Sequence, residues 1–127
     1  MNGKEQMPIQ VEEDARSLME EMDGDAELAA EMAQLFFRTA AEQIDGLRAG
    51  LAGNDLEQIV FKAHKCAGGA CACGFERLAE QLARLEHEAR GMDPVALAAA
   101  IEEIARIYDE TREGVLAFLD EALWSDV

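Results

Sequence analysis

Apolar residues recur every three or four positions along most of this chain, which is the spacing of one face of an α-helix. Residues 9–22, 25–51 and 75–91 each carry such a stripe, and a last stripe runs from Leu97 to Phe118. We expect each segment to form a helix with its stripe packed inward. In the longest of the first three, 25–51, the stripe consists of Leu28, Met32, Leu35, Phe36, Ala40, Ile44, Leu47 and Leu51.

Short breaks separate these segments. Asp23-Gly24-Asp25 ends the first helix and supplies an N-cap for the second. Gly53-Asn54-Asp55 ends the second helix and opens another, which Gly74 interrupts or ends. Asp93-Pro94 is an N-cap followed by a proline at the first helical position. Because the connections are short, the sequence predicts an all-α fold, an antiparallel up-down four-helix bundle with a short additional N-terminal helix.

The length of 127 residues fits one hydrophobic core. We interpret residues 1–8 as a flexible N-terminal tail and residues 9–122 as a single helical domain. A net charge of −16 argues against binding to nucleic acid or to an anionic membrane, since phosphates would repel it. Residues 1–10 lack the apolar core of a signal peptide, and no run of apolar residues is long enough to span a membrane. We expect a cytoplasmic, soluble monomer with reduced cysteines.

The segment 58–75 differs from the rest of this acidic chain. It contains no Asp or Glu, and it holds His64, Lys62, Lys65 and all three cysteines. At about 100° per residue, Gly68 and Cys71 fall on the same side of a helix as His64. A small apolar stripe falls on the opposite side and consists of Ile59, Ala63, Cys66, Ala70 and Cys73. The segment therefore predicts a helix that packs through this stripe and presents an imidazole on its other face.

Two adjacent glycines follow the histidine in this segment. A glycine inside a helix costs roughly 1 kcal/mol relative to alanine, so Gly68-Gly69 is unfavourable unless a bare backbone is useful. Gly68 lies one turn beyond His64 and would leave the imidazole ring unobstructed.

These residues resemble the histidine-containing phosphotransfer (HPt) domain of two-component phosphorelays. The resemblance rests on Ala63-His64, Gly68 and Gly74, together with Leu85-Glu86, which is similar to a Leu-Glu pair on the family's next helix. The sequence departs from the family pattern at Ala67, where the family usually has a lysine. The resemblance covers roughly residues 25–120.

The resemblance implies that His64 is a phosphoacceptor. Near pH 7 an imidazole has a free lone pair that can attack phosphorus. The phosphoryl donor would be a receiver aspartate or a hybrid sensor histidine kinase, and the acceptor a response-regulator receiver domain. The chain would be a phosphocarrier and not an enzyme, with no cofactor of its own, because in-line positioning and charge neutralisation can come from the partner's Mg²⁺ and lysine.

Several residues around His64 are candidates for contact with the phosphoryl group or the partner. Lys65 has a flexible stem that could reach the phosphoryl oxygens in place of the lysine absent at Ala67. The bare surface at Gly68 and the thiol of Cys71 share the histidine's face. Val60 and Phe61 lie one turn before His64, and either they form an apolar docking patch or neighbouring helices cover them. The predicted contact residues are Val60, Phe61, Lys65, Ala67, Gly68 and Cys71.

Two alternatives remain open from the sequence. The chain could be a helical adaptor that docks on receiver or kinase domains without transferring phosphate, and Ala67 is the best support for that hypothesis. Cys66, Cys71 and Cys73 with His64 could also suggest a metal or redox site. Because Cys66 and Cys73 lie on the other side of the helix from His64, we expect packing and no metal site. We interpret His87, between two glutamates, as an ordinary solvated surface residue.

Overall fold

The computed structural model of the protein describes residues 9–125, so the predicted tail of residues 1–8 lies outside it. The described residues form five α-helices and one short 3₁₀ turn, with no strand among them. The helices are α1 (Ile9–Glu21), α2 (Ala26–Ala52), α3 (Leu56–Cys73), α4 (Glu76–Glu88) and α5 (Pro94–Ser125), and the turn η2 (Ala89–Gly91) follows α4.

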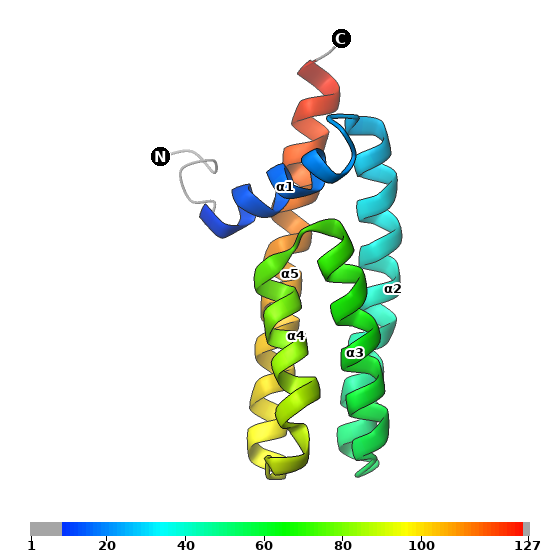
Figure 1. Cartoon of the computed structure of the whole chain (residues 1–127), viewed down its shortest axis with the longest axis vertical. Helices are drawn as coiled ribbons and strands as arrows, with labels where there is room; N and C mark the ends of the chain where they lie inside the picture. Colours follow the sequence, from blue (N-terminus) through cyan, green and yellow to red (C-terminus); the bar gives the residue numbers. More distant parts are fainter. Residues whose placement is uncertain (1–8, 126–127) are drawn as a thin grey trace.

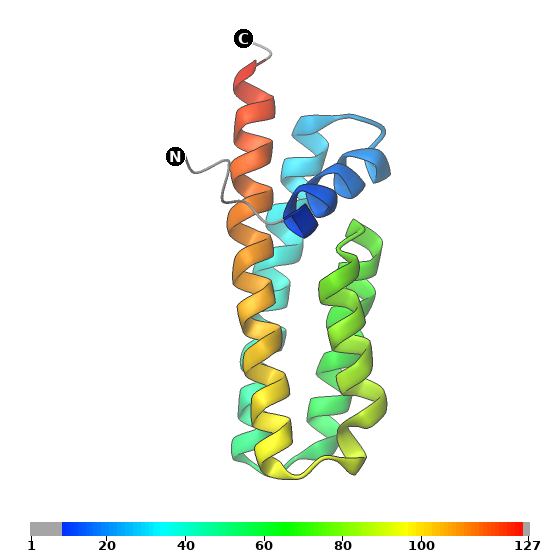
Figure 2. The ribbon, with the colours of Figure 1, turned by 90° about the vertical axis from the view of Figure 1, so that its left-hand side faces the viewer.

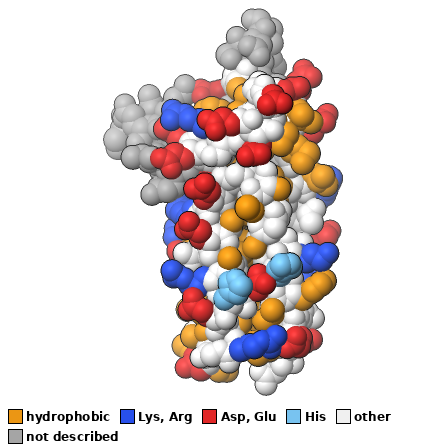
Figure 3. Space-filling model, viewed as in Figure 1, with side chains coloured by type: hydrophobic (Ala, Val, Ile, Leu, Met, Phe, Trp, Pro, Cys, Tyr) orange, Lys and Arg blue, Asp and Glu red, His pale blue; other side chains and the backbone are white. Residues whose placement is uncertain are grey.

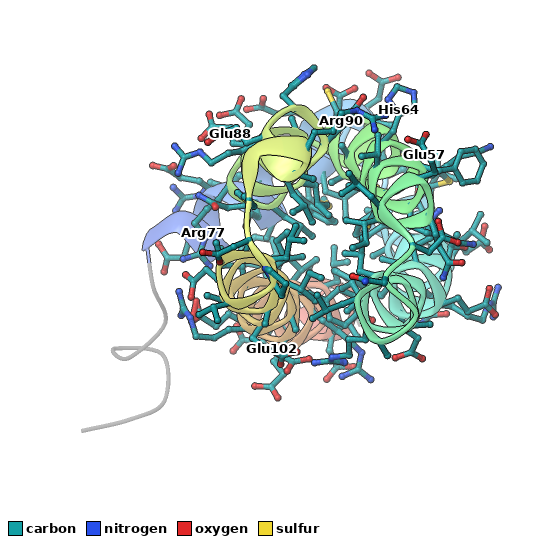
Figure 4. The ribbon with its side chains drawn as sticks, turned by 90° about the horizontal axis from the view of Figure 1, so that it is seen from below. Glu57, His64, Arg77, Glu88, Arg90 and Glu102 are labelled. Carbon is teal, nitrogen blue, oxygen red and sulfur yellow. The ribbon has the colours of Figure 1, made fainter. Side chains whose placement is uncertain are left out.

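Helices α2 to α5 run alternately up and down, and α1 crosses the bundle near one end (Figures 1 and 2). Seen along its axis, the bundle has these four helices at its corners, with α3 and α4 adjacent on one side and α2 and α5 on the other (Figure 4). The predicted all-α, up-down four-helix bundle with an additional N-terminal helix is confirmed.

Three aspartates begin helices, as their positions predict. The Oδ1 atoms of Asp25, Asp55 and Asp93 each accept a hydrogen bond from a backbone N–H three residues later, at 3.0, 3.1 and 2.8 Å. Each bond satisfies a first-turn N–H that has no partner within its helix. Gly74 ends α3 with φ of 80°, in the left-handed region that favours glycine.

Close approach of backbones at glycines fixes how α3 packs on α2. At Gly50, a Cβ would lie 2.9 Å from the Ile59 Cγ1 atom, closer than side chains approach. At Gly69, a Cβ would lie 3.1 Å from two ring carbons of Phe36. The absence of a side chain at these two positions therefore lets α3 pack tightly on α2.

An aromatic cluster fills the core between α2, the α3–α4 turn and α5. The rings of Phe37 and Phe75 stack with centroids 5.5 Å apart, and Phe36 and Tyr108 pack edge-on against this pair. The Tyr108 hydroxyl donates a hydrogen bond of 2.6 Å to the backbone oxygen of Phe37. This bond satisfies the buried hydroxyl and ties α5 to α2.

Two residues expected in the core of α2 are instead on the surface. Leu28 is 41% exposed and Leu35 is 49% exposed. The apolar stripe read from the sequence was wider than the face that α2 buries, which is centred on Ala29, Ala33 and Phe36. Helix α1, which packs mainly on α5, does not cover either leucine.

Candidate functional site

His64 lies near the middle of α3 and points away from the bundle. Its side chain is 70% exposed, on the side of the molecule formed by α3 and α4 (Figure 4). The histidine side chains are visible on this face in Figure 3. The stripe predicted on the opposite face of the helix is buried throughout: Ile59, Ala63, Cys66, Ala70 and Cys73. The predicted orientation of the helix, with its imidazole outward, is confirmed.

A hydrogen bond from the neighbouring helix orients this imidazole. The Nδ1 atom of His64 lies 2.9 Å from Oε2 of Glu86 on α4, whose side chain is 21% exposed. An ionised carboxylate only accepts hydrogen bonds, so Nδ1 carries the proton of the bond. In the neutral ring Nε2 then keeps its lone pair, so Nε2 is the ring nitrogen that is able to act as a nucleophile.

The surface next to the imidazole is bare. A Cβ at Gly68 would meet nothing within 4 Å, whereas a Cβ at Gly69 would press on Phe36. The lack of a side chain therefore has a different effect at each of the two adjacent glycines. Gly69 allows close helix packing, and Gly68 leaves open space beside His64.

Two lysines of α3 lie near His64, and they are held differently. Lys65 is exposed, with its Nζ 5.5 Å from the centroid of the Phe61 ring, within the range of a cation–π interaction. The aliphatic stem of Lys62 packs over Gly46 of α2, and a Cβ at Gly46 would lie only 3.0 Å from the Cε atom of Lys62. Ala67 is half-buried and packs against the core. Lys65 is thus the more exposed of the two cations close to the histidine.

The two apolar residues before His64 have different surroundings. Phe61 is 55% exposed, so it is available to a partner, while Val60 is half-buried and packs against the core. The sequence left open whether these two residues are exposed or covered by neighbouring helices. Phe61 is exposed, and Val60 is partly covered.

The cysteines divide as the helical projection predicts. Cys66 and Cys73 are buried, and this burial raises the pKa of their thiols to about 12 and about 11, so both stay protonated near neutral pH. Cys71 is exposed on the histidine's side of α3. Among the described residues, no cluster of three or more His, Cys, Asp or Glu side chains is placed to hold a metal ion.

Glu86 is the residue of this site that reasoning from the sequence missed. Its place beside Leu85 was noted, but not its bond to a histidine 22 residues away. The available signal was its register on α4: Leu78, Leu82 and Leu85 are buried, and Glu86 follows at the edge of that face. His87, the next residue, is exposed, in agreement with its interpretation as surface.

The fold and this site define a helical bundle that presents one oriented, exposed histidine from the middle of a helix. The family model for the Hpt domain matches residues 31–114, about two-thirds of the chain, and the chain belongs to that family. Hpt domains are phosphocarrier modules of two-component signalling and not enzymes.

No curated protein and no solved structure matches this sequence. Within residues 9–125, no helix is long and apolar enough to cross a membrane.

Proposed function

We propose that the protein is a phosphorelay intermediate that carries a phosphoryl group on Nε2 of His64. The donor is a receiver aspartate or a sensor kinase, and the acceptor is the receiver domain of a response regulator. The observation that carries this proposal is the 2.9 Å bond between His64 Nδ1 and Glu86, made by a ring that is otherwise open to a partner.

The hydrogen bond suits the charge change of the reaction. When Nε2 attacks an aspartyl phosphate, an N–P bond forms, the P–O bond to the aspartate breaks, and the aspartate leaves as a carboxylate. The ring keeps its proton on Nδ1 and becomes positively charged. The carboxylate of Glu86 lies against that proton, so it stabilises the charge as it develops. The reverse steps pass the group to the next receiver.

The partner supplies much of the remaining chemistry in this proposal. Phosphoryl transfer depends on in-line positioning and on neutralising the charge of the phosphoryl oxygens, which the receiver's Mg²⁺ site and lysine provide. On this chain, exposed Lys65 is the cation closest in sequence to His64, and Ala67 supplies none. Phe61 and the open surface at Gly68 lie in the partner's footprint. Val60 borders it, and Cys71 lies further along the same face. In this proposal the protein is a monomer, and it acts in the cytoplasm, where its partner domains also lie.

Transfer from a phosphorylated receiver domain tests the proposal. The native chain and a His87→Gln control should become labelled, and His64→Gln should not, because His87 is exposed on α4 but lacks the bond that orients His64. The label should be acid-labile and base-stable. Lys65→Ala should accept the group several-fold more slowly than Lys62→Ala. Equal labelling of His64→Gln would refute the assignment of the site.

A non-transferring adaptor is the second candidate, and Ala67 is the observation that favours it. If the protein is an adaptor, the native chain and the His64→Gln variant should bind receiver or kinase domains with the same affinity, and neither should become labelled. Binding without labelling, across several candidate receivers, would therefore support the adaptor over the relay.

A further inference from the structure

A second surface of interest lies on the side of the bundle away from His64. Helices α2 and α5 are adjacent there, across the bundle from the α3–α4 side on which His64 is labelled (Figure 4). Between them is a hollow of about 300 Å³. It is lined by Gln34, Phe37, Arg38, Ala41, Tyr108, Arg112 and Leu116.

The arginines of this hollow differ from most others in the chain. Five of the six other arginines are in ion pairs with carboxylates: Arg48, Arg77, Arg84, Arg90 and Arg106. Arg38 and Arg112 are exposed, and within residues 12–122 neither lies in an ion pair. In a chain of net charge −16, two unpaired cations on one hollow are a local reversal of charge that favours an anionic partner.

The floor of the hollow is apolar and already formed. Phe37 and Tyr108 are buried, and the Tyr108 hydroxyl is used by its bond to the Phe37 backbone oxygen. Ala41 and Leu116, at the edge of the core, complete the apolar lining. A partner that covers this floor gains apolar burial without requiring the core to rearrange.

The hollow is part of a longer groove between α2 and α5. A second hollow of about 100 Å³ shares Ala41 and Tyr108 with the first and is lined further along by Asp45, Asp109 and Arg48. The guanidinium of Arg48 is already in ion pairs with Glu102 and Asp45. From Gln34 to Arg48, α2 advances about 20 Å. The groove thus has two unpaired cations at one end, an apolar middle, and at the other end two carboxylates beside an arginine that is already paired. Such a length suits a stretch of polypeptide better than a small anion.

We propose that the α2–α5 groove is a docking site for an amphipathic protein segment whose acidic residues bind Arg38 and Arg112. Apolar residues of the segment cover Tyr108 and Ala41, and a basic residue at its other end faces Asp45 and Asp109. Because the groove lies away from His64, such a partner binds without covering the phosphoacceptor. It could therefore hold the protein beside a signalling partner while His64 remains accessible.

Two synthetic helical peptides of about 14 residues, enough to span the groove, test the proposal. Both have leucines at i, i+3, i+4 and i+7. One carries glutamates at the end that faces the arginines and a lysine at the other end, and the second has these charges exchanged. Titrated into the ¹⁵N-labelled protein up to about 1 mM, the first should shift backbone signals along α2 and α5, less so as salt is raised. The second should bind at least tenfold more weakly.

Charge-reversal variants identify the arginines. Arg38→Glu with Arg112→Glu should abolish binding of the first peptide, and Arg38→Gln with Arg112→Gln should weaken it. The matched control, Arg16→Glu with Arg84→Glu, makes the same change of net charge at exposed positions of α1 and α4 and should leave binding intact.

Unchanged melting temperatures would show that these variants remain folded. The proposal is overturned if the first peptide causes no shifts, if its shifts fall around His64, if both peptides bind equally, or if the control variant loses binding to the same degree. Phosphotransfer is not used in this test, so its outcome does not depend on the relay function.

Discussion

At the scale of single residues, the imidazole of His64 depends on one contact from another helix. Sequence alone indicated which residue was exposed, because the spacing of small residues on α3 defines its buried face. It did not indicate the tautomer, because the partner, Glu86, is brought close only when α4 packs against α3. Contacts between helices depend on crossing geometry, which a single helical projection does not contain.

Replacing Glu86 by alanine should therefore impair transfer while preserving the fold. In the proposed relay, the variant loses the group that fixes the proton on Nδ1 and stabilises the positive ring, and we expect transfer to slow by about tenfold, equivalent to about 1.4 kcal/mol. Ring ¹⁵N shifts of His64 should show a change in the tautomer mixture. Glu88→Ala is the matched control, since Glu88 is exposed on the same helix and pairs with Arg84 instead. A slow variant with unchanged ring shifts would argue against this role.

At the scale of helices, the adjacent glycines of α3 give a paired prediction. Gly68→Ala adds a methyl group where nothing lies within 4 Å, so helix propensity should raise the free energy of unfolding by up to about 1 kcal/mol. Gly69→Ala adds a methyl group 3.1 Å from the Phe36 ring, so the required shift of the ring should offset this gain and lower stability by about 1 kcal/mol. Chemical denaturation of both variants measures the difference.

Measuring the rate of phosphotransfer distinguishes a functional role from a structural role at Gly68 and Gly69. If the bare surface at Gly68 serves the partner, Gly68→Ala should be more stable and yet slower in transfer. Gly69, which faces Phe36, should affect transfer only through stability. A Gly68→Ala variant as active as the native chain would remove the functional reason for that glycine.

The helices themselves were largely predictable, because their signals are local. Caps at Asp25, Asp55 and Asp93 and the stop at Gly74 depend on a few neighbouring residues. The exposure of Leu28 and Leu35 was not predictable, since it depends on which face of α2 the other helices cover. The α2–α5 groove also escaped sequence reasoning, because Arg38 and Arg112 come from helices far apart in the chain.

At the scale of the whole molecule, α1 is the described helix that lies wholly outside the residues that the family model matches. It lies across the bundle near the α3–α4 turn (Figure 1), and a Cβ at Gly74 would be only 2.7 Å from Cβ of Ser17. Asp14 of α1 is 4% exposed, and one of its oxygens, Oδ2, has no hydrogen-bond partner in the described part of the chain. Because Asp14 is buried on α1, we expect the docking of α1 to depend on pH.

Burial raises the pKa of Asp14 from 3.8 to about 6, against the opposing attraction of Arg77. The folded protein thus holds this proton more tightly than the unfolded chain. The stabilisation of the folded protein that comes from protonated Asp14 is complete below about pH 4, and it is lost as the pH rises through about 6. Asp14→Asn removes the buried charge, so it should raise the free energy of unfolding at pH 7.5 by up to about 3 kcal/mol and make little difference near pH 4. Denaturation of both proteins across this pH range, with exposed Glu20→Gln of the same helix as control, measures the effect. A constant difference between native protein and Asp14→Asn at every pH would show that the carboxylate is not titrating within the fold.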